Sequence, residues 1–141
     1  MSIVQPWLSG ARVVDLFAGS GALGLESLSR GAESCDFIES SAKSLIALRA
    51  NITTLDASPR AHVHHVDALR YAMERTAGEY HIAFADPPYE RGLAPKLAER
   101  WLAVRFAEVL GVEHSTREEL PPGGERRRYG TTAITFYGLR R

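Results

Sequence analysis

The sequence contains one cysteine, no excess of charge and no long apolar run. With Cys35 alone among 141 residues, no internal disulfide can form, and its place within an apolar run indicates a buried, reduced thiol and a cytoplasmic protein. Lys plus Arg equals Asp plus Glu at 17 each, which argues against a polybasic or disordered chain. Met1–Ala11 has no cationic and apolar leader, and no segment is long enough to span a bilayer, so we expect no membrane association.

The length predicts a single domain over residues 1–141, with one core and no separate recognition domain. Short β-branched runs alternate with amphipathic helical stretches along the chain. Expected strands are Arg12–Phe17, Ser34–Glu39, Ala61–Val66, Tyr80–Ala85 and Glu108–Glu113, expected helices are Gly21–Arg30, Ala42–Thr54, Ala68–Thr76 and Ala94–Leu102, and Arg126–Tyr137 reads as a closing hairpin that turns near Gly130. This order predicts an α/β fold with a mostly parallel sheet, helices on both faces and an antiparallel edge pair.

Acidic residues follow the expected strands. Asp15, Glu39, Asp67 and Asp86 each stand at or just after a strand's carboxyl end. Ligands of such sheets bind at that edge, near the switch in strand order, so we expect these four side chains along one rim.

The stretch VVDLFAGSGALGLES contains Gly19-x-Gly21-x-x-Gly24, with Glu39 twenty residues after Gly19, which is also the spacing of a dinucleotide fingerprint. A pyrophosphate favours nearby cations, yet no Lys or Arg occurs from Val13 to Ser29, and Asp15 immediately precedes the loop. S-adenosylmethionine, with an ammonium, a sulfonium, a ribose diol and no phosphate, suits this charge pattern better. NAD therefore remains the alternative cofactor, and a merely structural strand-to-helix turn would leave Asp15 unexplained.

The second motif is FADPPYE, in which Asp86-Pro87-Pro88-Tyr89 ends the fourth strand. Two prolines fix a rigid turn and remove two N–H donors, leaving the carbonyls of Asp86 and Pro87 free to accept. Such acceptors can hold the hydrogens of an exocyclic amine on a planar base while Tyr89 stacks on the base, which must lie outside its duplex. A stiff turn with a surface tyrosine is the simpler alternative.

With both motifs in place, the chain resembles the small bacterial 16S ribosomal RNA guanine-N2 methyltransferases. The resemblance rests on DLFAGSGALGLESLSRGA, FIES, DAL, FADPPY, VEHS and RRYGTTAITFY and runs across nearly the whole chain. It implies a Rossmann-like class I methyltransferase domain with a seven-stranded sheet. Members of this family usually carry a basic N-terminal arm, and Met1–Ala11 resembles only the end of its helix.

The resemblance also implies roles for individual residues. Cofactor-binding residues would be Asp15, Gly19, Gly21, Glu39, Asp67 and Ala68, the last two beside the adenine of S-adenosylmethionine, and Asp86, Pro87 and Tyr89 would form the target-base site. The implied substrate is one guanine of 16S rRNA, within the small ribosomal subunit, and the implied reaction uses no metal. Nothing in the sequence demands a dimer, so we expect a monomer.

Three alternatives remain open. A DNA adenine-N6 or cytosine-N4 methyltransferase shares the Asp-Pro-Pro-Tyr acceptors but generally needs additional surface to read the major groove. A non-catalytic RNA-binding module could keep the fold, although Asp86 and Tyr89 are intact. An NAD-dependent oxidoreductase is the third.

A histidine cluster and a run of arginines are the remaining candidate binding features. His62, His64 and His65 lie on one expected strand without a matching Cys or His cluster elsewhere, so we expect no metal site. Residues 125–141 hold five arginines, Arg126, Arg127, Arg128, Arg140 and Arg141, and one glutamate, a net charge of +4 that can meet phosphate or only solvate an edge strand. The roles of His114 and Ser115 stay unassigned.

Overall fold

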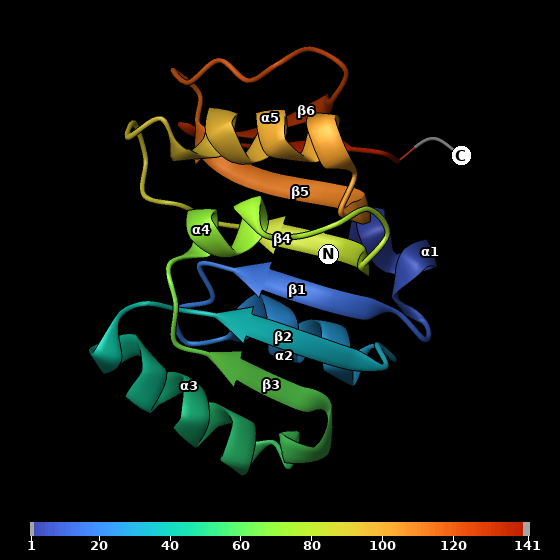
Figure 1. The fold of residues 1–141 in the computed structure, drawn as a ribbon, viewed down its shortest axis with the longest axis vertical. Helices are drawn as coiled ribbons and strands as arrows, with labels where there is room; N and C mark the ends of the chain where they lie inside the picture. The colour runs from blue at the N-terminus through green and yellow to red at the C-terminus, as the bar shows by residue number, and fades with distance from the viewer. Residues whose placement is uncertain (1, 140–141) are drawn as a thin grey trace.

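The structure, a computed structural model, describes residues 2–139 and is built around one seven-stranded sheet (Figure 1). The strands are β1 (Arg12–Leu16), β2 (Ser34–Ile38), β3 (Ala61–His64), β4 (Tyr80–Ala85), β5 (Ala107–Ser115), β6 (Glu125–Tyr129) and β7 (Thr132–Tyr137). The α-helices are α1 (Gln5–Leu8), α2 (Ala22–Ser29), α3 (Ala42–Thr54), α4 (Ala68–Met73) and α5 (Leu93–Val104), and two 3₁₀ turns cover Ser2–Val4 and Ser58–Arg60.

The strand order is β3-β2-β1-β4-β5-β7-β6. Strands β1 to β5 run parallel, while β7 pairs antiparallel with both β5 and β6. Because β1 pairs with β2 on one side and with β4 on the other, the order reverses at β1. The carboxyl ends of β1 and β4 therefore meet at the switch point where such sheets bind ligands.

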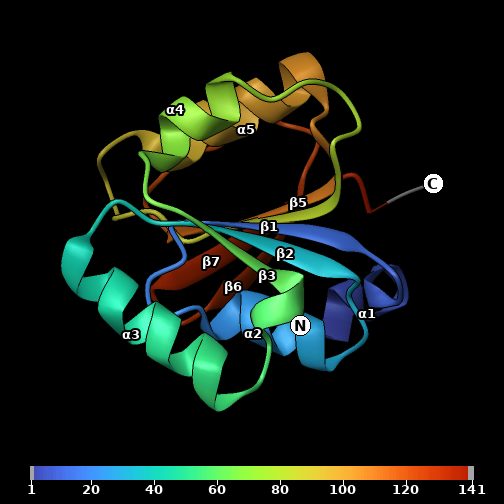
Figure 2. The ribbon, with the colours of Figure 1, turned by 60° about the horizontal axis from the view of Figure 1, so that its bottom comes forward.

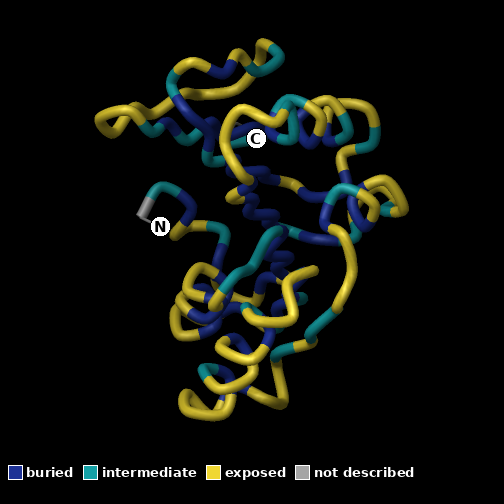
Figure 3. Tube along the Cα trace, turned by 90° about the vertical axis from the view of Figure 1, so that its left-hand side faces the viewer, coloured by how far each residue is buried: buried dark blue, intermediate teal, exposed yellow. Residues whose placement is uncertain are grey.

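Helices cover both faces of the sheet. α4 and α5 lie on one face, and α1, α2 and α3 lie on the other (Figure 2). Trp101 and Leu97 anchor the first layer, whereas Phe37 and Leu48 anchor the second, and all four are almost completely buried. At the far edge, every residue of β6 is exposed (Figure 3).

A polar network fastens α4 to the sheet. The Tyr80 hydroxyl donates to Asp36 Oδ2 at 2.5 Å and lies 2.6 Å from the Tyr71 hydroxyl of α4. Because α4 has only six residues, its position depends on such tertiary contacts rather than on helix propensity. This network therefore helps to fix the loop that leads from β3 into α4.

The expected strands and helices are all present, and several boundaries differ. β5 is longer than expected, running to Ser115, because its last residues pair with the β6–β7 hairpin from Thr132 onward. α4 ends earlier, at Met73, and α5 extends from Leu93 to Val104 between two residues in the left-handed region, Gly92 and Arg105. The periodicity of the local sequence gives no information on pairing between distant strands or on tertiary contacts. The predicted ends of these elements therefore differ from the observed ones.

None of the helices within residues 2–139 combines the length and apolarity needed to cross a bilayer.

Candidate functional site

The loop between β1 and α2 leaves the sheet through unusual backbone conformations. Phe17 has a φ of 60°, Gly19 of 58° and Gly21 of 88°. The two glycines serve different purposes. A Cβ on Gly19 would meet no atom within 4 Å, whereas one on Gly21 would lie 2.4 Å from Leu48 Cδ1. Gly19 thus borders open space that a ligand can approach, and Gly21 allows the close packing of the loop against α3.

Asp15 is not the exposed anion that the charge argument from the sequence assumed. It is only 2% exposed, and its Oδ2 accepts a hydrogen bond from the Gly24 N–H at 3.1 Å. Gly21, which precedes α2, offers no side-chain cap, so Asp15 supplies a capping acceptor to the first turn from the neighbouring strand.

Burial raises the pKa of Asp15 to about 8, an effect that the Gly24 hydrogen bond opposes and that Asp86 and Glu39 reinforce. At neutral pH the carboxyl group is therefore mostly protonated in the absence of a cation. An ammonium group bound nearby would favour its ionised form, so the expected attraction depends on the ligand itself.

Glu39 ties the glycine loop to the start of α3. Its Oε1 accepts from the Gly19 N–H at 2.7 Å, and its Oε2 accepts from the Ser41 N–H at 2.8 Å. The carboxylate is half-buried and still has lone pairs for further donors. It is thus held beside Gly19, in a position where hydroxyl groups of a ribose can donate to it.

Asp67 and Ala68 lie at the neighbouring strand end. Asp67 is exposed and caps α4, its Oδ2 accepting from the Arg70 N–H at 2.9 Å, while Ala68 is buried. The Glu39 N–H donates to the His64 carbonyl at 3.1 Å, which joins the end of β2 to that of β3. The structure therefore brings the two candidate adenine residues to the same rim as Glu39.

These residues fit S-adenosylmethionine. Gly19 leaves room for close approach, and Glu39 presents two fixed oxygens that suit a diol. Asp15 lies beneath the loop as a carboxyl group able to ionise beside a cation. No basic side chain occurs in the loop to receive a pyrophosphate, which disfavours NAD.

The Asp86–Tyr89 turn leaves β4 one strand away from the glycine loop. Pro87 is buried, and its carbonyl accepts no hydrogen bond among residues 2–139. Asp86 and Tyr89 are exposed, and the Tyr89 hydroxyl donates to Glu113 Oε1 at 3.0 Å and lies 3.0 Å from Thr132 Oγ1. The Pro87 carbonyl is thus free to accept within the described residues, and the contacts of the Tyr89 hydroxyl tie this turn to β5 and β7.

Glu113 is the residue of this site that sequence reasoning did not assign. Its carboxyl group accepts a hydrogen bond from the Tyr89 hydroxyl and lies close enough to Asp86 to affect the protonation of that residue. Desolvation, followed by the charge and hydrogen bond of Glu113, raises the pKa of Asp86 to about 6. An acidic residue near the carboxyl end of a strand adjacent to β4 was the available signal, but only the pairing of β5 with β4 and β7 shows what Glu113 contacts.

The remaining sequence candidates lie elsewhere. His114 is buried on the opposite face of β5 from Glu113, and its Nε2 and Nδ1 lie 2.8 Å from Thr135 Oγ1 and 2.9 Å from the Ser115 carbonyl. Within the described part of the chain, no three His, Cys, Asp or Glu side chains gather in a way that could hold a metal ion. Arg140 and Arg141 fall outside the described residues.

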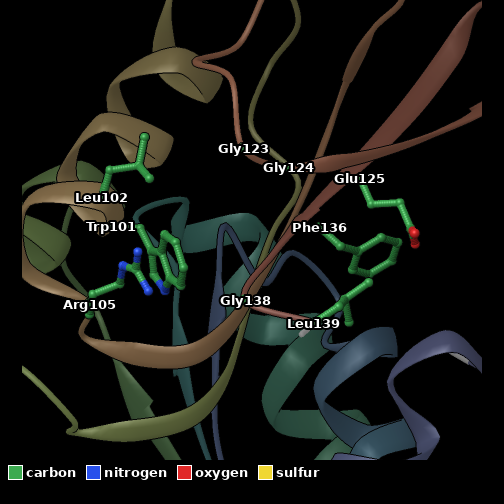
Figure 4. Close-up of a pocket in the computed structure, with 9 residues that line it drawn as sticks. All are labelled: Trp101, Leu102, Arg105, Gly123, Gly124, Glu125, Phe136, Gly138 and Leu139. Atoms are coloured by element: carbon green, nitrogen blue, oxygen red, sulfur yellow. The ribbon is translucent and has the colours of Figure 1, made fainter. Parts of the chain in front are cut away.

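A well-formed pocket of the described structure lies away from this rim. A concavity of about 550 Å³ lies beside the amino end of β5 and is lined by Trp101 of α5, by Arg105, which follows that helix, and by Phe136, Leu139 and Glu125 (Figure 4). The Arg105 guanidinium is 4.3 Å from the Trp101 ring centroid. None of the candidate site residues lines it.

The strand order, the glycine loop after β1 and the acceptor turn after β4 define the fold of the class I methyltransferases. A solved structure from Escherichia coli titled "Putative methyltransferase yhhF" has the same fold, with a TM-score of 0.82 and 29% identity over 96% of this chain and 79% of that one. Residues 1–138 match the model of the family described as "Conserved hypothetical protein 95", and the chain belongs to that family.

Curated relatives carry ribosomal RNA methyltransferase names. "Putative rRNA methyltransferase YlbH" of Bacillus subtilis is 33% identical over 151 residues, covering 99% of this chain and 82% of the relative. "Ribosomal RNA small subunit methyltransferase D" of Escherichia coli K12 is 40% identical over 90 residues. That match covers 64% of this chain and 44% of the relative, so it spans less than half of the Escherichia coli protein.

Proposed function

We propose that this chain is an S-adenosylmethionine-dependent ribosomal RNA methyltransferase that modifies the exocyclic N2 amine of a guanine in 16S rRNA. The observation that carries the proposal is the pair of acceptors at Asp86 and Pro87, beside Tyr89 and one strand from the Gly19 loop. The names of the relatives support the rRNA substrate. The proposal includes a cytoplasmic monomer, one domain over residues 1–141 and the assembled small subunit as substrate.

In this proposal Gly19, Glu39 and the Asp67–Ala68 pair hold the cofactor, with Asp15 and Gly21 supporting the loop. S-adenosylmethionine would supply an electrophilic methyl group, which is transferred when the N–C bond forms, the C–S bond breaks and the bonding pair remains on sulfur. No metal and no covalent enzyme intermediate are involved.

The chain's own residues act on the amine. The conjugated lone pair of an exocyclic amine is a weak nucleophile unless its hydrogens are held and its orientation is fixed. The Pro87 carbonyl and an ionised Asp86 accept these hydrogens, while Tyr89 stacks on the base. After transfer, the cationic amine loses a proton to Asp86 or to water.

In this proposal Glu113 influences the protonation of Asp86. Its carboxyl group interacts with that of Asp86 and accepts from the Tyr89 hydroxyl, so the acceptor and the stacking ring share one neighbouring side chain. With its pKa raised to about 6, Asp86 is largely ionised at neutral pH yet basic enough to take up a proton. Glu113 is thus a positioning residue in this mechanism.

The test is transfer of labelled methyl from S-adenosylmethionine to unmodified small ribosomal subunits, naked 16S rRNA and duplex DNA, followed by nucleoside analysis. N2-methylguanosine from a ribosomal substrate supports the proposal, whereas label only in DNA adenine or cytosine overturns it. Asp86→Ala should abolish transfer while leaving S-adenosylhomocysteine affinity intact. RNA binding without transfer by either form would indicate a non-catalytic module, and binding of NADH but not S-adenosylhomocysteine would indicate an oxidoreductase.

A further inference from the structure

The β6–β7 hairpin extends the sheet beyond the proposed target-base site, and its two faces differ. Paired residues of antiparallel strands share a face. Ile134 pairs with both Glu113 and Arg127, and Thr132 pairs with Tyr129. Arg127 and Tyr129 therefore lie on the sheet face that carries Glu113.

The other two arginines of β6 lie on the opposite face. Arg126 pairs with Thr135 and Arg128 pairs with Ala133, one residue out of phase with Arg127. The Arg126 guanidinium donates to the Thr116 carbonyl at 2.8 Å, and that of Arg128 donates to the Gly130 carbonyl at 3.3 Å. Three consecutive arginines that look equivalent in the sequence are thus divided by the pleat of the strand.

The face of Arg127 and Tyr129 is continuous with the target-base site through Thr132. Thr132 Oγ1 lies 3.0 Å from the Tyr89 hydroxyl, and Thr132 is also the cross-strand partner of Tyr129. The two tyrosines consequently flank one threonine. Gly130, with a φ of 66°, begins the two-residue turn that places Tyr129 opposite Thr132, as a type II′ turn requires.

The chemistry of this face suits a single strand of nucleic acid. Tyr129 is 62% exposed, and every residue of β6 is exposed. Arg127 pairs with Glu125 at 2.9 Å, but a solvent-exposed pair of this kind contributes little and can be exchanged for a phosphate. An aromatic platform next to a guanidinium is the combination that binds unpaired bases and their backbone.

We infer that Arg127 and Tyr129 form a contact surface for the single-stranded RNA next to the target nucleotide, with Tyr129 stacking on a flanking base and Arg127 contacting its phosphate. This inference rests on the proposed function for the identity of the nucleic acid. Arginines that only protected an edge strand from association would be interchangeable. If this face binds RNA, substitution of Arg127 should weaken RNA binding more than substitution of Arg126 or Arg128.

The experiment compares Tyr129→Ala and Arg127→Ala with Arg128→Ala and Arg126→Ala, which make the same charge change on the other face. Methyl transfer to unmodified small subunits and to naked 16S rRNA gives KM and kcat. Fluorescence anisotropy with a short labelled single-stranded RNA, in the presence of S-adenosylhomocysteine, gives Kd without requiring catalysis. Affinity for S-adenosylhomocysteine alone reports whether each variant is folded.

Tyr129→Ala should weaken RNA binding about five- to hundredfold, the loss of one base stack, with kcat little changed. Arg127→Ala should lower the slope of log Kd against log salt by about 0.7, the value for one phosphate contact to a single strand. Tyr129→Phe should retain most of the affinity because stacking needs the ring and not the hydroxyl. Arg128→Ala should bind and react like the parent chain.

Equal losses for Arg126, Arg127 and Arg128 would overturn the inference, because they would show an undirected electrostatic effect. A Tyr129→Ala defect seen only with assembled subunits, and not with naked rRNA or the oligonucleotide, would indicate a ribosomal protein contact and would also overturn it. If the parent chain methylates no RNA, the proposed function fails by itself. The anisotropy series still decides whether this face binds a single strand.

Discussion

Asp86 and Glu113, which come from the ends of adjacent strands, interact through their carboxyl groups, and after desolvation the charge and hydrogen bonding of Glu113 raise the pKa of Asp86. Two carboxyl groups in contact favour a state in which one proton lies between them, since two neighbouring negative charges repel. The Tyr89 hydroxyl donates to the same Glu113. The proposed acceptor, its proton partner and the stacking ring therefore form one unit, and disturbing any member should be visible in the pH dependence of the reaction.

Glu113→Gln should move the acidic limb of the pH–rate profile to lower pH. Asp86 acts as an acceptor when ionised, so activity of the parent chain should fall as pH drops through about 6. Removing the charge of Glu113 takes away one cause of the raised pKa of Asp86, whereas the glutamine amide can still accept from Tyr89. The pH dependence of kcat/KM for rRNA measures the shift. Glu108→Gln, at an exposed position on the same strand, is the control, and an unchanged limb in Glu113→Gln would contradict this role.

Glu39→Gln should weaken S-adenosylhomocysteine binding about 10- to 100-fold. The carboxylate makes charge-assisted hydrogen bonds to the Gly19 and Ser41 N–H groups, and such bonds are worth about 1.5–3 kcal/mol. The glutamine offers only one oxygen, so the loop and the ribose would compete for it. Isothermal titration measures the affinity. Glu26→Gln, on the exposed side of α2, should change nothing, and equal effects of the two would remove Glu39 from the cofactor site.

Asp15→Asn should flatten the pH dependence of stability. The folded pKa of Asp15 is raised from 3.8 to about 8, so the folded chain binds a proton that the unfolded chain releases above pH 3.8. Asp15 therefore stabilises most below pH 3.8, and its contribution is lost as pH rises toward about 8, by at most about 1.4 kcal/mol per pH unit.

Urea unfolding of both chains at several pH values between 4 and 9 isolates this contribution, because every other group cancels in the difference. Asparagine reproduces the neutral acid and can still accept from the Gly24 N–H. The advantage of Asp15→Asn over the parent chain should grow as pH rises to about 8 and then level off. A difference independent of pH would show that Asp15 is ionised throughout.

Gly19→Ala should mainly affect cofactor binding, whereas Gly21→Ala should mainly affect packing against Leu48. Both glycines have positive φ, which costs an alanine about 1–2 kcal/mol. The alanine at position 21 would also press on Leu48, adding about 1–3 kcal/mol of overpacking. Thermal unfolding should show the larger loss for Gly21→Ala, and cofactor titration should show that Gly19→Ala loses affinity although its Cβ meets no protein atom. Equal unfolding losses would contradict the different packing of the two positions.

Local sequence patterns were sufficient for the secondary structure and the fold class. Short apolar runs and helical periods predicted all seven strands and the helices α2 to α5, whereas α1 (Gln5–Leu8) was not predicted. The glycine loop and the two prolines marked the ends of β1 and β4, since those residues restrict or free the backbone wherever they occur. Strand ends were less well placed at β5, whose final residues are held by β7 and not by their own neighbours.

What the sequence by itself determined, then, is the order of strands and helices along the chain, the rim at which Glu39, Asp67 and Asp86 follow their strands, and the two prolines that shape the turn after β4. Tertiary structure alone decided three things. It buried Asp15 and so removed most of its charge, it brought Glu113 to Asp86, and it divided Arg126 and Arg128 from Arg127. Each depends on burial or on pairing between distant strands, and a pKa or a face of a sheet is set by those surroundings rather than by the residue type.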